Sequence, residues 1–139
     1  IDFHIPHDYA PGTDLYIHVH WSHNSATVTT GSVNWLIEGS YSKGFDQAAF
    51  GTPITVNISD TASTTRYQHL VSEVQFSNDG GTGGLLNTND IEVDGILFFK
   101  VSLTSNTMDG GALPFMHFLD IHYQSTSVAT KNKAPDFYT

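Results

Sequence analysis

The segment 15–21 constrains the fold more than any other part of the chain, because its side chains alternate strictly in character. Apolar residues occupy positions 15, 17, 19 and 21, and Tyr16, His18 and His20 lie between them. Successive side chains of a β-strand point to opposite faces, so the pattern predicts a strand with one apolar face and one aromatic and imidazole face. A solvent face is normally polar, with residues such as Lys, Glu or Thr. We therefore expect a partner subunit, a ligand or a metal to cover the second face.

The composition excludes several classes of partner. The chain has 139 residues, with 5 Lys and Arg against 14 Asp and Glu, and its formal net charge is -9. This charge argues against nucleic acid and against a basic patch that holds an anionic membrane. The absence of Cys excludes disulfides and thiolate zinc sites. Since the sequence has no apolar run of membrane-spanning length, we expect no stable membrane insertion of this domain.

Alternating and apolar segments recur along the chain and predict an all-β fold. The segment 67–76 fits a helix nearly as well as a strand, and its neighbours favour a strand. The loop 78–84 is rich in glycine but lacks the Gly-Lys-Ser/Thr ending of a phosphate loop. Roughly eight β-segments without a convincing helix predict a β-sandwich, and a jelly roll is the natural topology at this length. The clearest segments besides 15–21 are 1–5, 27–41, 54–58, 67–76, 94–103 and 115–123.

The chain shows no internal repeat and no linker, so we expect a single jelly-roll domain over residues 1–139. The sequence begins at Ile1 without Met, already in a strand-like segment, and residues 131–139 have the character of a natural terminus. We therefore expect a C-terminal fragment of a longer, fibrous protein.

Several predicted strands carry large apolar side chains on both faces, although each sheet of a sandwich needs only one covered face. Apolar patches of this kind normally mark protein interfaces, and their burial is worth roughly 25 cal/mol per Å². Alternatively, long loops cover some of these residues. We expect a homotrimer, since three-fold closure suits a domain at the end of a fibrous chain. The large side chains beyond those that one covered face needs are Tyr16, Ile96, Phe98, Met116 and Phe118.

The chain contains eight histidines, a large number for its length. His18 and His20 share one strand face, about 7 Å apart along the strand, and form half of a workable metal site. His117 or a symmetry-related copy would add a third nitrogen. No carboxylate stands at an obligatory spacing from these residues, so hydrogen-bonded interface histidines are the favoured interpretation. We expect no metal and no cofactor; if a metal binds, its ligands are His18 and His20.

A metal-dependent enzyme is the first alternative function. Gly12 followed by His18-Val19-His20 resembles the opening of the cupin motif, in which two His, a Glu and a later His hold a metal. Asn and Ser stand at positions 24 and 25, where the Glu is expected, and the later element of the motif lacks its Gly before His117.

Other catalytic arrangements are weaker. The sequence contains no Gly-x-Ser-x-Gly elbow. Glu38 and Glu73 would form a carboxylate pair for glycoside hydrolysis only if the fold brought them together. The sequence therefore predicts that the protein is not an enzyme.

A longer pattern covers residues 6–21 and carries a resemblance to a known family. It joins Pro6-His7-Asp8-Tyr9 to Gly12-Thr13-Asp14-Leu15-Tyr16 and then to His18-Val19-His20-Trp21. The pattern resembles a signature of structural proteins of tailed bacteriophages, in the globular C-terminal heads of their tail fibres and tail needles. The resemblance implies a tumour-necrosis-factor-like jelly roll, a homotrimer and a place at the virion tail tip. It further implies extracellular action at the host envelope, by attachment or penetration, without shared catalytic residues.

Receptor contact by such a head would use exposed aromatic side chains, and Tyr9, Tyr41 and Tyr138 are the surface candidates. Trp21 and Trp35 are expected in the core because of their alternation with polar residues. The host component would be a glycan or a protein, and a cleft between subunits at the imidazole face is a second ligand site. A carbohydrate-binding module, typically a monomer with a flat aromatic strip, is the second alternative function.

Overall fold

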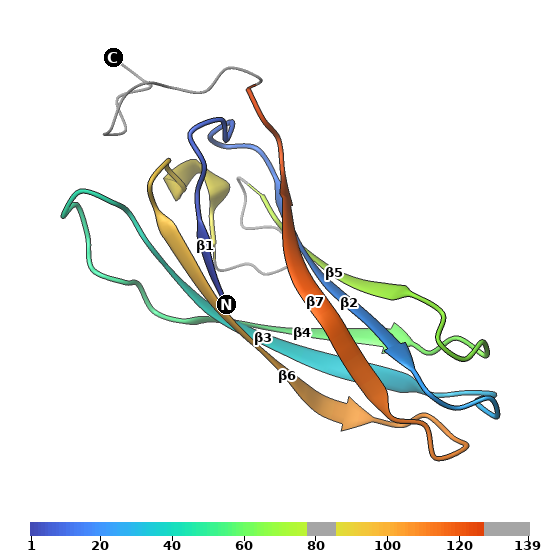
Figure 1. Cartoon of the computed structure of the whole chain (residues 1–139). Helices are drawn as coiled ribbons and strands as arrows, with labels where there is room; N and C mark the ends of the chain where they lie inside the picture. The colour runs from blue at the N-terminus through green and yellow to red at the C-terminus, as the bar shows by residue number, and fades with distance from the viewer. Residues whose placement is uncertain (78–85, 127–139) are drawn as a thin grey trace.

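Strands form where the sequence alternates, and the chain folds as an all-β protein. The computed structural model describes residues 1–77 and 86–126, so the loop 78–84 and Tyr138 lie outside the described residues. The one helical element in these ranges is the 3₁₀ turn Thr88–Asp90, which is far too short to cross a membrane. The strands are β1 (Asp2–His4), β2 (Leu15–His23), β3 (Ser32–Ser42), β4 (Ile54–Thr61), β5 (Leu70–Phe76), β6 (Ile96–Asn106) and β7 (Pro114–Tyr123) (Figure 1).

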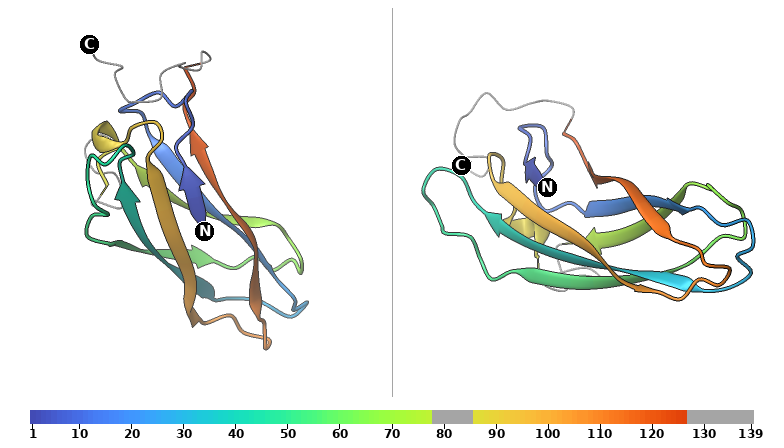
Figure 2. Two further views of the ribbon diagram at one scale, coloured as in Figure 1. Left: turned by 60° about the vertical axis from the view of Figure 1, so that its left-hand side comes forward. Right: turned by 60° about the horizontal axis from the view of Figure 1, so that its bottom comes forward.

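The strands lie in two antiparallel sheets that pack as two layers (Figure 2). One sheet has the strand order β1-β6-β3-β4, and the other has the order β5-β2-β7. Among the described strands, each connection except the β3–β4 hairpin passes from one sheet to the other. The all-β class and an arrangement consistent with a β-sandwich are thereby confirmed.

The apolar faces of the two sheets form the core. The apolar positions 15, 17, 19 and 21 of β2 are at most 1% exposed, as the alternation predicted. Trp21 and Trp35 come from opposite sheets, and their rings meet edge to face with centroids 6.1 Å apart. The indole N–H of Trp21 donates to Ser72 Oγ at 2.9 Å. The expected core placement of both tryptophans is confirmed.

Two strands begin later than the alternation predicts. The strand expected over 27–41 begins at Ser32, because Gly31 has a φ of +115°, a conformation that side chains disfavour. A Cβ on Gly31 would lie 2.5 Å from the carbonyl O of Thr107. The segment 67–76 is a strand, as preferred over a helix, but it begins at Leu70 because Tyr67 turns the chain with a φ of +60°.

Of the three tyrosines expected at the surface, one is buried and one is half-buried. Tyr9 is fully buried, because it pairs with Ser125 just after β7, and its hydroxyl donates to the carbonyl O of Thr13 at 3.1 Å. The prediction for Tyr9 is therefore wrong. Tyr41 is half-buried, and its hydroxyl accepts the Glu92 N–H at 2.8 Å, so its polar end is also engaged within the fold.

Tyr41 should make the stability of the fold sensitive to alkaline pH. Burial raises the pKa of Tyr41 from 10.0 to about 12. A group with a raised pKa in the folded state contributes stability that is complete below about pH 10 and is lost as the pH rises towards 12. Tyr41→Phe should therefore lose less stability than the parent chain across this window, although it is less stable at neutral pH because the Glu92 N–H lacks its acceptor. Urea unfolding at several alkaline pH values measures both trends, and parallel losses in the two proteins would contradict the expectation.

The basic side chains in the described ranges are engaged by neighbours. Lys43 Nζ donates to Glu92 Oε1 at 2.8 Å, and Lys100 Nζ donates to Glu38 Oε2 at 2.7 Å. Arg66 lies over the ring of the following tyrosine, 5.0 Å from its centroid. The net negative charge of the chain therefore comes from carboxylates that these cations do not neutralise.

Candidate functional site

The outer face of the β5-β2-β7 sheet gathers most of the residues that the sequence singles out. Antiparallel pairing sets His18 of β2 directly between Asp120 of β7 and Glu73 of β5. The next row of the sheet places His20 opposite Phe118. Side chains two apart on a strand share a face, so the two rows form one continuous surface.

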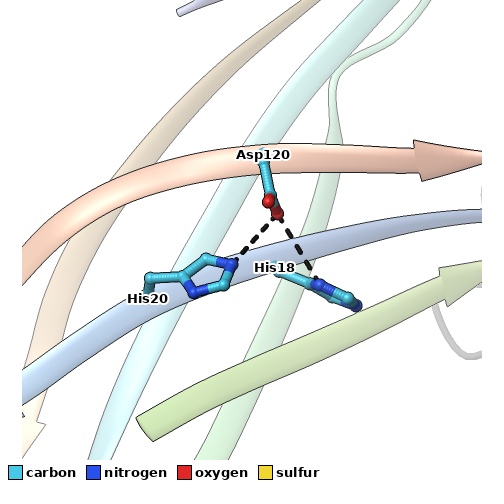
Figure 3. Close-up of side chains that lie close together, drawn as sticks. All are labelled: His18, His20 and Asp120. Carbon is cyan, nitrogen blue, oxygen red and sulfur yellow. Dashed lines mark hydrogen bonds and ion pairs between the residues drawn. The ribbon is translucent and has the colours of Figure 1, made fainter. Parts of the chain in front are cut away.

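Asp120 draws the two histidines of β2 together (Figure 3). Its Oδ1 lies 3.2 Å from His20 Nε2 and 3.6 Å from His18 Nδ1. One possible ligand atom from each of the three residues lies within 4.8 Å of the others. We call these residues the His18–His20–Asp120 group. No sequence pattern singles out Asp120, because pairing between strands so far apart in the chain leaves no characteristic spacing; alternation places it only on the same face as Phe118 in the segment 115–123.

Two further side chains hold the outward nitrogens of these histidines. His18 Nε2 lies 2.7 Å from Glu73 Oε2. His20 Nδ1 lies 2.6 Å from His69 Nε2, and the two rings stack with centroids 4.8 Å apart. Both ring nitrogens of His18 and of His20 therefore have a polar neighbour.

His122 completes the network on β7. Its Nε2 lies 3.3 Å from Asp120 Oδ2, and its ring packs against His18 with centroids 4.2 Å apart. Both oxygens of Asp120 are therefore engaged by imidazoles. Such an assembly of ring nitrogens and carboxylate oxygens can share protons among its members or bind a divalent metal ion.

A β-bulge separates His117 from this group. The register of β2 and β7 shifts between His20 and Trp21, which leaves His117 without a paired residue on β2. Its Nε2 lies 3.0 Å from the Oγ of buried Ser22. Because of this extra residue, His117 of the same chain does not join His18 and His20 as the third nitrogen that the sequence suggested.

Large apolar side chains are exposed beside the imidazoles. Phe118 stacks on the His20 ring with centroids 4.1 Å apart and remains 49% exposed. Val71 and Phe115, which pair with His20 and Ser22, are 44% and 39% exposed. We call Phe118, Val71 and Phe115 the Phe118 patch. The second apolar face expected for the segment 115–123 is therefore present at Phe118, and a single chain leaves it uncovered, whereas the bulge sets Met116 opposite the buried Trp21 and takes it off this face.

Phe98 lies apart from these residues. It alternates on β6 with the buried Leu97 and Phe99, and therefore points outward from the four-stranded sheet. It is 44% exposed, and its ring packs against Phe50 with centroids 5.0 Å apart. The predicted contact residues thus divide between two outer faces, with Phe98 on one and Tyr16, His18, His20, His117 and Phe118 on the other.

The catalytic arrangements considered from sequence are not assembled. Glu38 of β3 and Glu73 of β5 lie on the outer faces of different sheets and bond to different partners, so they form no carboxylate pair. His117, the late ligand of the cupin-like pattern, bonds to Ser22 rather than joining the two β2 histidines.

A small open pocket lies at the Tyr16 end of the same face, with a volume of about 270 Å³. The Tyr16 hydroxyl donates to Asp14 Oδ2 at 3.2 Å, and Gln75 Nε2 donates to the same oxygen at 2.9 Å. Desolvation and the hydrogen bond to Asp14 raise the pKa of Tyr16. The lining residues are Asp14, Tyr16, His18, Glu73, His122, Tyr123 and Gln124.

The fold and the site define an all-β protein of two sheets, one of which carries imidazoles and apolar side chains on its outer face. Comparison with protein-family models, curated proteins and solved structures found no match. The function is therefore inferred from the chain itself.

Proposed function

We propose that the chain is the distal knob of a tail needle or tail fibre of a tailed bacteriophage, a virion structural protein that acts at the host cell surface. In this proposal the domain is a homotrimer of tumour-necrosis-factor-like jelly rolls and serves attachment or envelope penetration. The observation that carries the proposal is the Phe118 patch, which lies beside the imidazoles of β2 and is exposed in the single chain. Contiguous apolar surface of this kind is normally buried in an interface.

Further observations support the proposal. The pattern over residues 6–21, which resembles phage heads, runs into β2, the central strand of the sheet that carries the patch. The passage of most connections between the two sheets agrees with a jelly roll. A cysteine-free, acidic chain is compatible with a virion surface if assembly supplies part of its stability.

Light scattering of the purified chain tests the assembly. We expect a species of about three times the chain mass of 15.2 kDa at micromolar concentration, because burial of the Phe118 patch favours association. Adsorption of the labelled trimer to a panel of bacterial cells then tests the surface role. A stable monomer would contradict the trimer, and a trimer that adsorbs to no cell would contradict receptor attachment by this domain.

The pocket beside Tyr16 favours sugar binding as a second candidate function. An aromatic ring, carboxylates and an amide line it, and such groups orient small polar ligands. Binding on a glycan array that is lost in Tyr16→Ala would support a glycan as the host component. The same result with a monomeric chain would instead indicate a carbohydrate-binding module.

A further inference from the structure

We propose that the outer face of the β5-β2-β7 sheet holds a binding site for a divalent transition-metal ion such as Zn²⁺. The ligands are His18 Nδ1, His20 Nε2 and Asp120 Oδ1, with at least one coordination position open to water or to a further ligand. All three residues come from one chain. The proposal therefore depends neither on the trimer nor on a virion role, and it adds a chemical property to either.

The separations between the ligand atoms fit such an ion. Zinc binds imidazole nitrogen and carboxylate oxygen at about 2.0–2.2 Å, so the ligand atoms of a tetrahedral site lie about 3.3–3.5 Å apart. Asp120 Oδ1 lies 3.2 Å from His20 Nε2 and 3.6 Å from His18 Nδ1. The three ligand atoms, one from each residue, lie within 4.8 Å of one another. Binding therefore requires that the two imidazoles approach each other by about 1.5 Å at most.

The bond to Glu73 determines which nitrogen of His18 carries the hydrogen. An ionised carboxylate only accepts hydrogen bonds, so His18 Nε2, 2.7 Å from Glu73 Oε2, is the donor. A neutral His18 ring then directs its Nδ1 lone pair towards Asp120 Oδ1, 3.6 Å away. Two acceptors that face each other in this way can both bind one metal ion placed between them.

Each proposed ligand is also held through its other polar atom. Metal-binding imidazoles usually bond through their second nitrogen to a carboxylate or another acceptor, and this fixes the ring and its tautomer. The group has this arrangement before any ion binds, which lowers the conformational cost of binding. The supporting residues are Glu73 for His18, His69 for His20, and His122 for Asp120.

A second set of histidines provides a matched comparison. His4 Nε2 and His7 Nε2 both lie 3.0 Å from Asp94 Oδ1, near the start of the chain. Their contacts converge on one carboxylate oxygen, yet within the described residues this set does not bring three ligand atoms into a common group as the residues of β2 and β7 do. His4, with 58% of its side chain exposed, is therefore a suitable control position.

Calorimetric titration of the chelator-treated full chain with zinc chloride tests the site. We expect one ion per chain with micromolar or tighter affinity. His18→Gln and Asp120→Asn should each weaken binding by at least about 100-fold, whereas Glu73→Gln should weaken it by about 10-fold, as is typical of outer partners. His4→Gln should leave affinity and stoichiometry unchanged. The visible spectrum of the Co²⁺-loaded chain should show a low-coordinate site that disappears in His18→Gln.

Two results would overturn the site. If the parent chain binds no Zn²⁺ up to about 100 μM, a concentration well above micromolar affinity, the His18–His20–Asp120 group is not a metal site. If Zn²⁺ binds but neither His18→Gln nor Asp120→Asn weakens it, the ion lies elsewhere. Circular dichroism and light scattering of every variant establish that fold and mass are retained, so a failure of the metal site is distinguishable from a failure of trimer assembly.

Discussion

Replacing Phe118 with Asp should convert the proposed trimer into a monomer. Phe118 belongs to the Phe118 patch and is 49% exposed in the single chain. Burial of its remaining surface is worth about 1 kcal/mol per subunit, and an unpaired buried carboxylate costs about 3 kcal/mol or more. Because three copies contribute, the association constant should fall by at least about 1000-fold. Light scattering over a range of chain concentrations measures this change.

Phe98→Asp is the matched control for this experiment. Phe98 has the same side chain and a similar exposure of 44%, but it lies on the outer face of the opposite sheet. The variant Phe98→Asp should therefore keep the molecular mass of three chains. If Phe98→Asp dissociates the trimer and Phe118→Asp does not, the interface lies on the four-stranded sheet. If neither variant changes the mass, apolar packing on these faces does not hold the subunits together.

Replacing Trp21 with Ala should remove a large part of the stability of the fold. Trp21 is fully buried, meets Trp35 across the two sheets and bonds to Ser72. Truncation of a buried Trp to Ala costs about 3–5 kcal/mol, because the contacts are lost and a cavity remains. A typical domain has only about 5–15 kcal/mol of stability in total. Urea unfolding at one fixed chain concentration measures the loss, since the proposed assembly would also contribute to stability.

Smaller changes at the same position separate packing from hydrogen bonding. Ser72→Ala keeps the indole but removes the acceptor of its N–H, and a buried unpaired donor costs about 1–3 kcal/mol. It should therefore destabilise the fold less than Trp21→Ala. A loss below about 1 kcal/mol for Trp21→Ala would show that the two sheets do not depend on this contact.

The alternation of side chains predicted the strands and the core because burial between two sheets imposes a period of two on the sequence. It placed the apolar residues of β2 and both tryptophans correctly. It failed at Tyr9, since a short polar segment between Pro and Gly is typical of an exposed turn. The pairing of Tyr9 with Ser125 depends on a contact between the two ends of the described chain, and no local pattern encodes such a contact.

The site was predictable only in part, for a related reason. The shared face of His18 and His20 follows from their spacing, and the structure places both on one surface. Asp120 joins them through strand pairing and His69 lies just before β5 against His20, and the sequence does not reveal the register between distant strands. The face on which His117 lies depends on a bulge. A bulge moves a residue to the other face without changing the composition of its strand.

The engagement of Lys43 and Lys100 by glutamates has a consequence for how the molecule approaches a surface. Under the proposed role at a host surface, a formal charge of -9 per chain means that an envelope rich in phosphate and carboxylate groups repels the molecule. At physiological ionic strength this repulsion extends only about 8 Å. The rate of encounter should therefore rise with added salt, whereas proteins that reach anionic surfaces through lysine and arginine slow down.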